Sequence, residues 1–380
     1  MFGKSFKLFE AFGFEFKVDL SWIVIAALVT WSLAVGFFPH VLEGLEPLEY
    51  WKLALIGAFG LFFSILFHEF WHSMVARKFG VEVRGITLFI FGGVAEMSQE
   101  PKTPQSEFWI AIAGPLASLF LALSFYLVYD SGIRFGMGEA LNSVFMYLAL
   151  VNLILAVFNL IPAFPMDGGR ILRAVLWKFK KDQLWATRVA TNFGMTFGLV
   201  LIGLGLLNVL TGNLVGGLWY CLIGFFIRFA ARNSYQRMAV KQALAGEQVR
   251  ALMKSPVTVI GVISLQEMVD DYVYRHHHKF YPVRDQHGVQ GCITTRQIGG
   301  VARDKWPTTQ VREVMSRCSR SNSVGPEEDV MDVLQKMNAS GLSRMMVMEG
   351  QNLVGIISLK DILGYLTARM ELRGEHGLGE

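Results

Sequence analysis

The sequence predicts a polytopic α-helical membrane protein that ends in a separate α/β domain. Three observations predict this fold class. Of the 380 residues, 53% are hydrophobic and the mean hydropathy is +0.40, which is too apolar for an ordinary soluble protein. The apolar runs are concentrated in residues 1–236, whereas residues 245–372 have the mixed composition of a soluble domain. Within that soluble part, sequence patterns recur with a period of about 62–64 residues.

Six apolar runs are each close to the roughly 20 residues that a helix needs to cross the hydrocarbon core of a bilayer. They cover residues 20–38, 51–75, 107–129, 143–163, 189–210 and 213–231. Lys and Arg are abundant in the N-terminal segment, after the second and fourth runs, and after the last run, whereas the opposite side has only Lys52 and Arg134. By the positive-inside rule, both termini are expected on the cytoplasmic side of the cell (inner) membrane.

Two segments of the membrane half do not fit simple spans. Residues 14–20 alternate apolar and polar side chains with a period of two, which is typical of a half-buried strand. Residues 81–97 are β-branched, broken by glycines and too short to span. We therefore expect a small membrane-embedded β-sheet with a hairpin, whose backbone is paired within the protein. An ordinary cytoplasmic loop is the alternative.

The second apolar run contains the motif His68-Glu69-Phe70-Trp71-His72. On a helix, an HExxH motif places two imidazoles one turn apart on one face, as a zinc site requires, with a carboxylate beside them. Ionisable groups at membrane depth are costly, so their presence there indicates function. The motif therefore favours hydrolysis inside a lipid bilayer, with a purely structural histidine pair as the alternative.

A third ligand is expected at the end of the fourth run, because zinc hydrolases usually use three protein ligands and keep one position for water. That run ends in NLIPAFPMDGG, in which two prolines break the helix before Asp167. Asp167 is the candidate ligand, Glu69 the candidate general base and acid, and Asn159 a candidate donor to the oxyanion. Alternatively, Asp167 caps a helix that begins near Gly169, and Asn159 satisfies a carbonyl freed beside Pro162.

These motifs resemble the site-2 protease family of intramembrane zinc metalloproteases. The resemblance covers roughly residues 10–230 and rests on HEFWH, on NLIPAFPMDGGR and on the Phe91–Met97 hairpin. It implies proteolysis of single-span membrane proteins, and one catalytic zinc ion per chain. It also implies the roles of five residues: His68, His72 and Asp167 as zinc ligands, Glu69 as the catalytic acid/base, and Asn159 as a contributor to the site.

Two further segments of the membrane half are expected to serve the site. The segment from Gly114 to Ser118, GPLAS, resembles the family's small-residue motif, where close helix packing is expected. Because a protease needs extended backbone, the hairpin is expected to offer an edge strand to the substrate through Gly92, Gly93 and Val94.

Two motifs recur in the soluble half. VRALM at 249–253 recurs as VREVM at 311–315, and GCITTRQI at 291–298 recurs as GIISLKDI at 355–362. This repeat resembles a pair of cystathionine-β-synthase (CBS) domains. In that family, the small and acidic residues of the second motif contact the phosphate and ribose of adenine nucleotides. The second copy has Ser358 and Asp361, whereas the first has Thr294 but Gln297 in place of the acid. One site for ATP or AMP is therefore expected, and a dimerisation module that binds nothing is the alternative.

The expected domain boundaries follow from these motifs. Residues 1–236 form the transmembrane zinc metalloprotease domain, 237–246 a linker, 247–305 and 306–372 the two CBS domains, and 373–380 a flexible tail. We expect a homodimer through the CBS pair. The segment from Arg228 to Gly246 either transmits a nucleotide signal or is a passive tether.

Two other classes of function compete with the protease. A CBS-gated transporter also places acidic groups and broken helices at mid-membrane, but it does not need HExxH facing an aspartate. A catalytically inactive membrane scaffold would not need an intact Glu69. The net charge of +4 gives no reason to expect a nucleic-acid partner.

Overall fold

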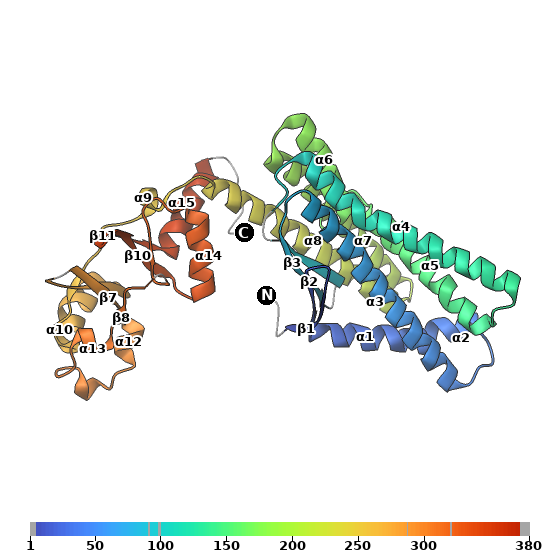
Figure 1. The fold of residues 1–380 in the computed structure, drawn as a ribbon, viewed down its shortest axis with the longest axis horizontal. Coiled ribbons are helices and arrows are strands. Elements are labelled where there is room, and N and C mark those ends of the chain that lie inside the picture. Colours follow the sequence, from blue (N-terminus) through green and yellow to red (C-terminus); the bar gives the residue numbers. More distant parts are fainter. Residues whose placement is uncertain (1–4, 90–91, 98–99, 287, 320, 373–380) are drawn as a thin grey trace. The chain divides into compact units, whose positions relative to one another are not determined.

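The computed structural model describes residues 5–89, 92–97, 100–286, 288–319 and 321–372, which form two compact units (Figure 1). The first unit reaches Tyr235 and the second begins at Gln236. The predicted flexible tail at 373–380 and Phe91 of the predicted hairpin lie outside the described residues.

The first unit contains nearly all of the long helices. Six helical stretches of the described chain are long and apolar enough to cross a membrane: Ser21–Val41, Pro47–Lys78, Pro104–Phe135, Glu139–Asn159, Gln183–Leu210 and Leu214–Leu244. The first comprises α1 (Ser21–Ser32), a π-helical turn (Leu33–Phe37) and α2 (Phe38–Val41); the others are α3, α4, α5, α7 and α8 in chain order. All six overlap the predicted runs, so the predicted polytopic fold is confirmed.

The helix boundaries have local causes. α3 begins with Pro47, whose fixed φ suits the first helical position, and ends with Arg77 and Lys78, which favour the negative end of the helix dipole. The Thr103 hydroxyl accepts a hydrogen bond from the backbone N–H of Ser106 and so caps α4.

The fourth predicted run extended four residues too far. α5 ends at Asn159 rather than at residue 163, because residues that precede proline are disfavoured in helical conformation. The chain then turns and enters α6 (Asp167–Lys180), a 14-residue helix that is too short to span.

A four-stranded sheet adjoins these helices and confirms the prediction for residues 14–20 and 81–97. Its order is β1 (Ser5–Ala11), β2 (Phe14–Asp19), β3 (Val83–Phe89) and β4 (Gly92–Met97). β2 pairs in parallel with β3, and the other two pairs are antiparallel. Its apolar face packs Phe14, Phe16 and Ile86 against Ala76 of α3 and Ile110 of α4. The sheet therefore lies against the part of α3 that carries the HExxH motif.

The second unit contains two short sheets, with strand orders β5-β6-β7-β8 and β11-β10-β9. The second repeat runs as helix, strand, strand and helix, from Val330–Ser340 through Arg344–Glu349 and Asn352–Ser358 to Leu359–Leu372. The elements of this unit are α9 (Val249–Leu252), β5 (Val259–Ile260), α10 (Leu265–Met268), a π-helical turn (Val269–Val273), α11 (Tyr274–His276), β6 (Phe280–Asp285), β7 (Gly288–Thr294), α12 (Thr295–Gly299), a 3-10 turn (Arg303–Lys305), α13 (Val311–Val314), β8 (Ser316–Arg317), β9 (Ser323–Val324), α14 (Val330–Ser340), β10 (Arg344–Glu349), β11 (Asn352–Ser358) and α15 (Leu359–Leu372).

Candidate metal centre

The two histidines of the HExxH motif lie on one buried face of α3. His68 and His72 are one helical turn apart, and only 4% and 3% of their surfaces are exposed. Their Nε2 atoms are 3.1 Å apart, so both imidazoles point to the same place. This arrangement is what the spacing of the motif predicts for a helix.

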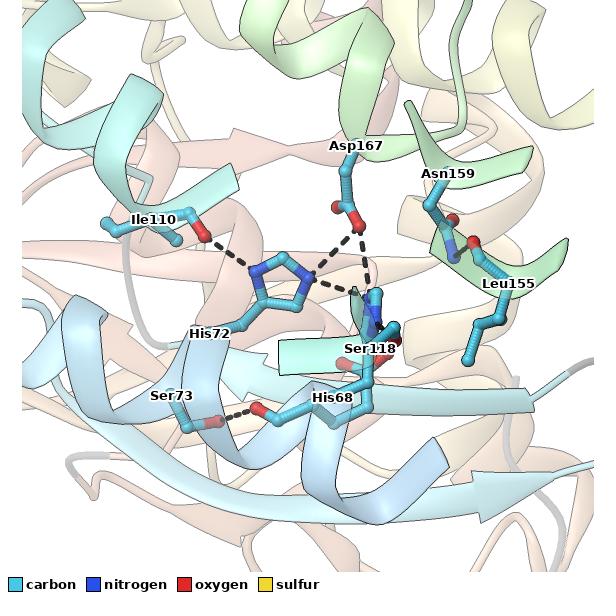
Figure 2. A network of polar contacts seen from close by, with 9 residues as sticks. His68, His72, Ser73, Ile110, Ser118, Leu155, Asn159 and Asp167 are labelled. Carbon is cyan, nitrogen blue, oxygen red and sulfur yellow. Dashed lines mark hydrogen bonds and ion pairs between the residues drawn. The ribbon is translucent and has the colours of Figure 1, made fainter. Parts of the chain in front are cut away.

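Asp167 completes a cluster of three ligand atoms. Its Oδ2 lies 3.2 Å from Nε2 of His68 and 3.1 Å from Nε2 of His72. Figure 2 shows the three side chains pointing towards one another. The three ligand atoms lie within 4.8 Å of one another. Asp167 is the first residue of α6, so it does not cap a helix that begins at Gly169.

Hydrogen bonds from a neighbouring helix fix the orientation of both imidazoles. Nδ1 of His72 lies 2.6 Å from the Ile110 carbonyl, which can only accept, so Nδ1 must carry the proton. In the neutral ring, Nε2 then keeps its lone pair for a ligand. Nδ1 of His68 lies 2.9 Å from the hydroxyl of the fully buried Ser118. Hydrogen-bond partners of this kind, at the second ring nitrogen, orient metal-binding histidines in many proteins.

Neither of these two partners is predicted from the sequence. Ser118 belongs to the GPLAS segment, for which the sequence predicts only close helix packing. A hydroxyl one turn after Gly114 in that segment was the available signal. The Ile110 carbonyl is a backbone group, so no residue type at position 110 could have revealed it.

Gly114 leaves the space in front of the two imidazoles open. A Cβ atom at Gly114 would lie 2.2 Å from Nε2 of His72 and 2.5 Å from Nε2 of His68. Two imidazole nitrogens and a carboxylate oxygen form a donor set typical of zinc, and here they face a space that any side chain at position 114 would fill. The residues therefore fit a zinc ion.

The glycines after Asp167 allow α6 to start against the preceding loop. A Cβ atom at Gly168 would lie 2.3 Å from the carbonyl oxygens of Leu160 and Ile161. At Gly169 it would lie 2.5 Å from the backbone of Ala163 and Phe164. The MDGG motif thus lets backbone pack on backbone, which brings the Asp167 side chain to the histidines.

The predicted catalytic carboxylate adjoins the edge of the sheet. Glu69 follows His68 on α3 and is half-buried. Its side chain contacts β4 so closely that a Cβ atom at Gly93 would lie 2.5 Å from Cγ of Glu69. The structure therefore brings Glu69 together with one of the three predicted substrate-binding residues, and Gly92 and Val94 flank that residue in β4.

Asn159 is not hydrogen-bonded to the three-ligand cluster in the described part of the chain. Its Nδ2 donates to the carbonyl of Leu155, one turn earlier on α5, at 3.0 Å (Figure 2). This contact matches the alternative that Asn159 satisfies a backbone carbonyl, although the carbonyl belongs to Leu155. Its role towards an oxyanion stays a prediction.

In the second repeat, the predicted nucleotide-binding residues lie together where β11 meets α15. The Ser358 hydroxyl donates to Oδ2 of Asp361, and the backbone N–H of Asp361 donates back to that hydroxyl at 3.2 Å. Nζ of Lys254 lies 2.5 Å from Oδ1 of Asp361. Partial burial opposes ionisation of Asp361, but Lys254 and Ser358 outweigh it, so the pKa of Asp361 is below its ordinary value.

The first repeat has the same local geometry without the charge. The Thr294 hydroxyl donates to Oε1 of Gln297 at 2.8 Å and caps α12. Nε2 of Gln297 donates to Ser316 at 2.9 Å and to the Val314 carbonyl at 3.2 Å. Gln297 is thus engaged on both sides, and it offers no carboxylate to a ribose.

Comparison with known proteins decides the family. A model of peptidase family M50 matches residues 56–141 and 136–204, and a CBS domain model matches residues 311–368. Rip3 of Mycobacterium tuberculosis (strain H37Rv), named as a candidate zinc metalloprotease, is 39% identical over 355 residues, which cover 92% of this chain and 90% of Rip3. The chain belongs to peptidase family M50.

A second curated relative agrees with this assignment. The zinc metalloprotease MJ0392 of Methanocaldococcus jannaschii is 32% identical to this M50 chain over 375 residues, which cover 98% of both chains. A solved structure, the site-2 protease from Methanocaldococcus jannaschii, is 33% identical, with a TM-score of 0.41, and covers 60% of this chain and 94% of that one. The M50 chain is therefore a multi-pass membrane protein and a zinc metalloprotease of the site-2 protease type, with a CBS domain. This membership excludes the transporter.

Replacing Gly114 by alanine is expected to abolish zinc binding, because the new Cβ would occupy the space in front of both Nε2 atoms. Zinc per chain in the detergent-purified protein measures this. Gly203→Ala on α7 is the matched control, since a Cβ atom there meets nothing within 4 Å. A folded Gly114→Ala protein with the zinc content of the wild type would contradict the geometry described here.

Proposed function

We propose that this protein is an intramembrane endopeptidase that cuts single-span membrane proteins within or near their membrane segment. One observation carries the proposal: His68, His72 and Asp167 present three ligand atoms within 4.8 Å of one another, and both histidines lie on a membrane-spanning helix. A hydrolytic site on such a helix reaches peptide bonds that a soluble protease does not reach.

His68, His72 and Asp167 would hold one zinc ion per chain, through two Nε2 atoms and one carboxylate oxygen. When bound, zinc supplies a Lewis acid that makes water nucleophilic near neutral pH and polarises the scissile carbonyl. The Ile110 carbonyl and the Ser118 hydroxyl keep the two imidazoles turned towards the site. Asp167 contributes one negative charge, which partly neutralises the ion in an apolar surrounding.

Glu69 is proposed to move the protons. It accepts a proton from the attacking water and returns one to the nitrogen of the leaving amine, so that its carboxylate is regenerated in each turnover. The C–N bond of the peptide breaks, and the water oxygen ends in the new carboxyl group. The position of Glu69, directly after His68 and against Gly93, supports this role.

The substrate is proposed to bind as an added strand along β4. In the sheet order β1-β2-β3-β4, β4 pairs with β3 alone among the described residues, and its other edge is proposed to receive an extended peptide. A helical substrate hides its peptide bonds, so local extension has to precede cleavage. Since Gly93 contacts Glu69, a peptide paired with β4 would lie near the catalytic carboxylate.

Two variants test this function in one cleavage assay with a set of single-span membrane proteins, each tagged at both ends. Glu69→Gln is expected to lower cleavage at least about 100-fold, because the proton carrier is lost, and to retain zinc. Val94→Pro is expected to abolish cleavage and to retain zinc, because proline disrupts main-chain pairing along β4. Val94→Ala is the matched control and should cleave normally. Cleavage by Glu69→Gln would refute the mechanism, and cleavage by Val94→Pro would refute strand addition.

We further propose that both termini face the cytoplasm of a cell whose inner membrane holds the six helices. The distribution of Lys and Arg between the two sides supports this orientation. The three cysteines offer a test. Cys318 in the second unit is exposed, whereas Cys292 is buried and its burial raises the pKa of its thiol to about 11, which makes it slow to react.

A membrane-impermeant maleimide is therefore expected to leave Cys318 unlabelled in intact cells and to label it after the membrane is permeabilised. A Cys221→Ala/Cys292→Ala variant leaves Cys318 as the single thiol of the chain. Labelling of equal extent in intact cells would reverse the proposed orientation.

Adenine nucleotide binding in the second unit is proposed to regulate cleavage. Ser358 and the ionised Asp361 would contact phosphate and ribose, and binding would displace Lys254 from the carboxylate. Asp361 lies in the first turn of α15, and Arg369 lies near the end of this helix. Nη1 of Arg369 donates to the carbonyl of Ala243, in the last turn of α8, at 2.6 Å, and also pairs with Glu247.

The same α8 helix touches the loop in front of Asp167. α8 runs without interruption from Leu214 to Leu244 and so contains residues of both units. In the first unit, Ile227 packs with Ala163 and Met166, and Ala231 packs with Phe164. A displacement of α8 would therefore act on the loop that positions Asp167, which favours signal transmission over a passive tether.

Arg369→Gln is expected to leave ATP and AMP binding unchanged and to remove the effect of nucleotide on the cleavage rate.

Asp361→Asn is expected to lower the affinity for nucleotide by about tenfold, since one charge-assisted contact is worth roughly 1.4 kcal/mol or more. Binding is measured by equilibrium dialysis on the full chain, with Arg312→Gln, at an exposed position, as control. No binding of either nucleotide by the wild type would favour the scaffold alternative for the repeat, and a normal nucleotide response in Arg369→Gln would exclude this route.

A further inference from the structure

A buried ion pair links α4 to α6 close to the metal centre. Glu107 on α4 is completely buried, and Arg173 on α6 is 6% exposed. Nε of Arg173 donates to Oε1 of Glu107 at 2.6 Å, and Nη2 of the same guanidinium contacts the same oxygen. Arg173 is one of the Lys and Arg residues that follow the fourth apolar run. In the structure its charge is instead neutralised inside the protein.

The positions of the two residues connect the pair with the ligands. Glu107 lies three residues before Ile110, whose carbonyl orients His72 at 2.6 Å. Arg173 lies six residues after Asp167 on the short α6 helix. The ion pair therefore joins the segment that aims one ligand to the segment that carries another.

We propose that Glu107 and Arg173 are positioning residues that set the separation between Asp167 and the two histidines. This inference rests on the proposed zinc site. Within the described part of the chain, neither Glu107 nor Arg173 has a hydrogen bond or ion pair with the three ligand atoms, so the pair acts through Ile110 and through α6. The Arg173 guanidinium also lies over the ring of Phe164, 5.1 Å from its centre, and so contacts the loop in front of Asp167.

A purely stabilising role explains the pair less well. Burying two charges costs more than their attraction usually returns, and apolar residues of similar volume are often as stable. Among the described residues, the second oxygen of Glu107, Oε2, has no hydrogen-bond partner, so the carboxylate is only half satisfied. An ion pair of this kind fixes the relative direction and the distance of its two side chains, which apolar packing does not.

The test compares metal binding with folding in two variants of the full chain in detergent. Glu107→Met/Arg173→Met replaces both charges by apolar volume, and Arg173→Lys keeps the charge but loses the planar fork. Each protein is titrated with Co²⁺, the absorption spectrum of the bound ion is recorded, and thermal unfolding is followed in parallel. Asp130→Met/Arg134→Met, which removes an exposed ion pair elsewhere on α4, is the matched control.

The double Met variant is expected to unfold near the wild-type temperature but to bind Co²⁺ roughly 10- to 100-fold more weakly, with altered absorption bands. Arg173→Lys is expected to lie between it and the wild type, and the control to match the wild type. Wild-type affinity and spectrum in the double Met variant would overturn the positioning role. If the double Met variant does not fold, wild-type affinity and spectrum in Arg173→Lys would overturn the positioning role. A folded wild type that binds neither Co²⁺ nor Zn²⁺ would instead overturn the proposed zinc site itself.

Discussion

Ionisable groups inside apolar membrane helices are stable only where other parts of the same chain satisfy them, and most of this structure depends on that constraint. His68 and His72 are buried on α3, and α4 satisfies both through Ile110 and Ser118. Asp167 approaches from α6 and faces both Nε2 atoms. Three separate helices, α3, α4 and α6, therefore have to meet at one point. The loop before α6 and the four-stranded sheet are arranged around that point.

Close approach of backbone makes this convergence possible. Gly114 leaves room in front of the imidazoles, and Gly168 and Gly169 let α6 begin directly on the preceding loop. Gly93 gives β4 the same close contact with Glu69. In each case a Cβ atom would lie 2.5 Å or less from its neighbour, so the glycines near the site reflect packing as much as flexibility. Glu69, the three proposed ligands and β4 are thus adjacent for the same physical reason.

The sequence predicted the parts of this arrangement whose signals are local. Hydrophobic length gave the six spans, the period of two gave β2, and the spacing of HExxH gave two imidazoles on one face. The proline-broken stretch ending in Asp167 pointed to the third ligand. Contacts between distant segments had no such signal: Ile110 acts through its backbone, and Glu107 pairs with Arg173 across 66 residues of sequence. The continuation of α8 to Leu244, through residues expected to be a linker, was also not predicted.

Three residues from two distant segments are proposed to hold one catalytic zinc ion. The decisive measurement is elemental analysis of zinc per chain in detergent-purified wild type and in the His68→Ala and Asp167→Ala variants. About one zinc per chain is expected in the wild type and its loss in both variants, since three protein ligands are the usual number for a catalytic site. A folded wild type without zinc, or undiminished zinc in either variant, would contradict it.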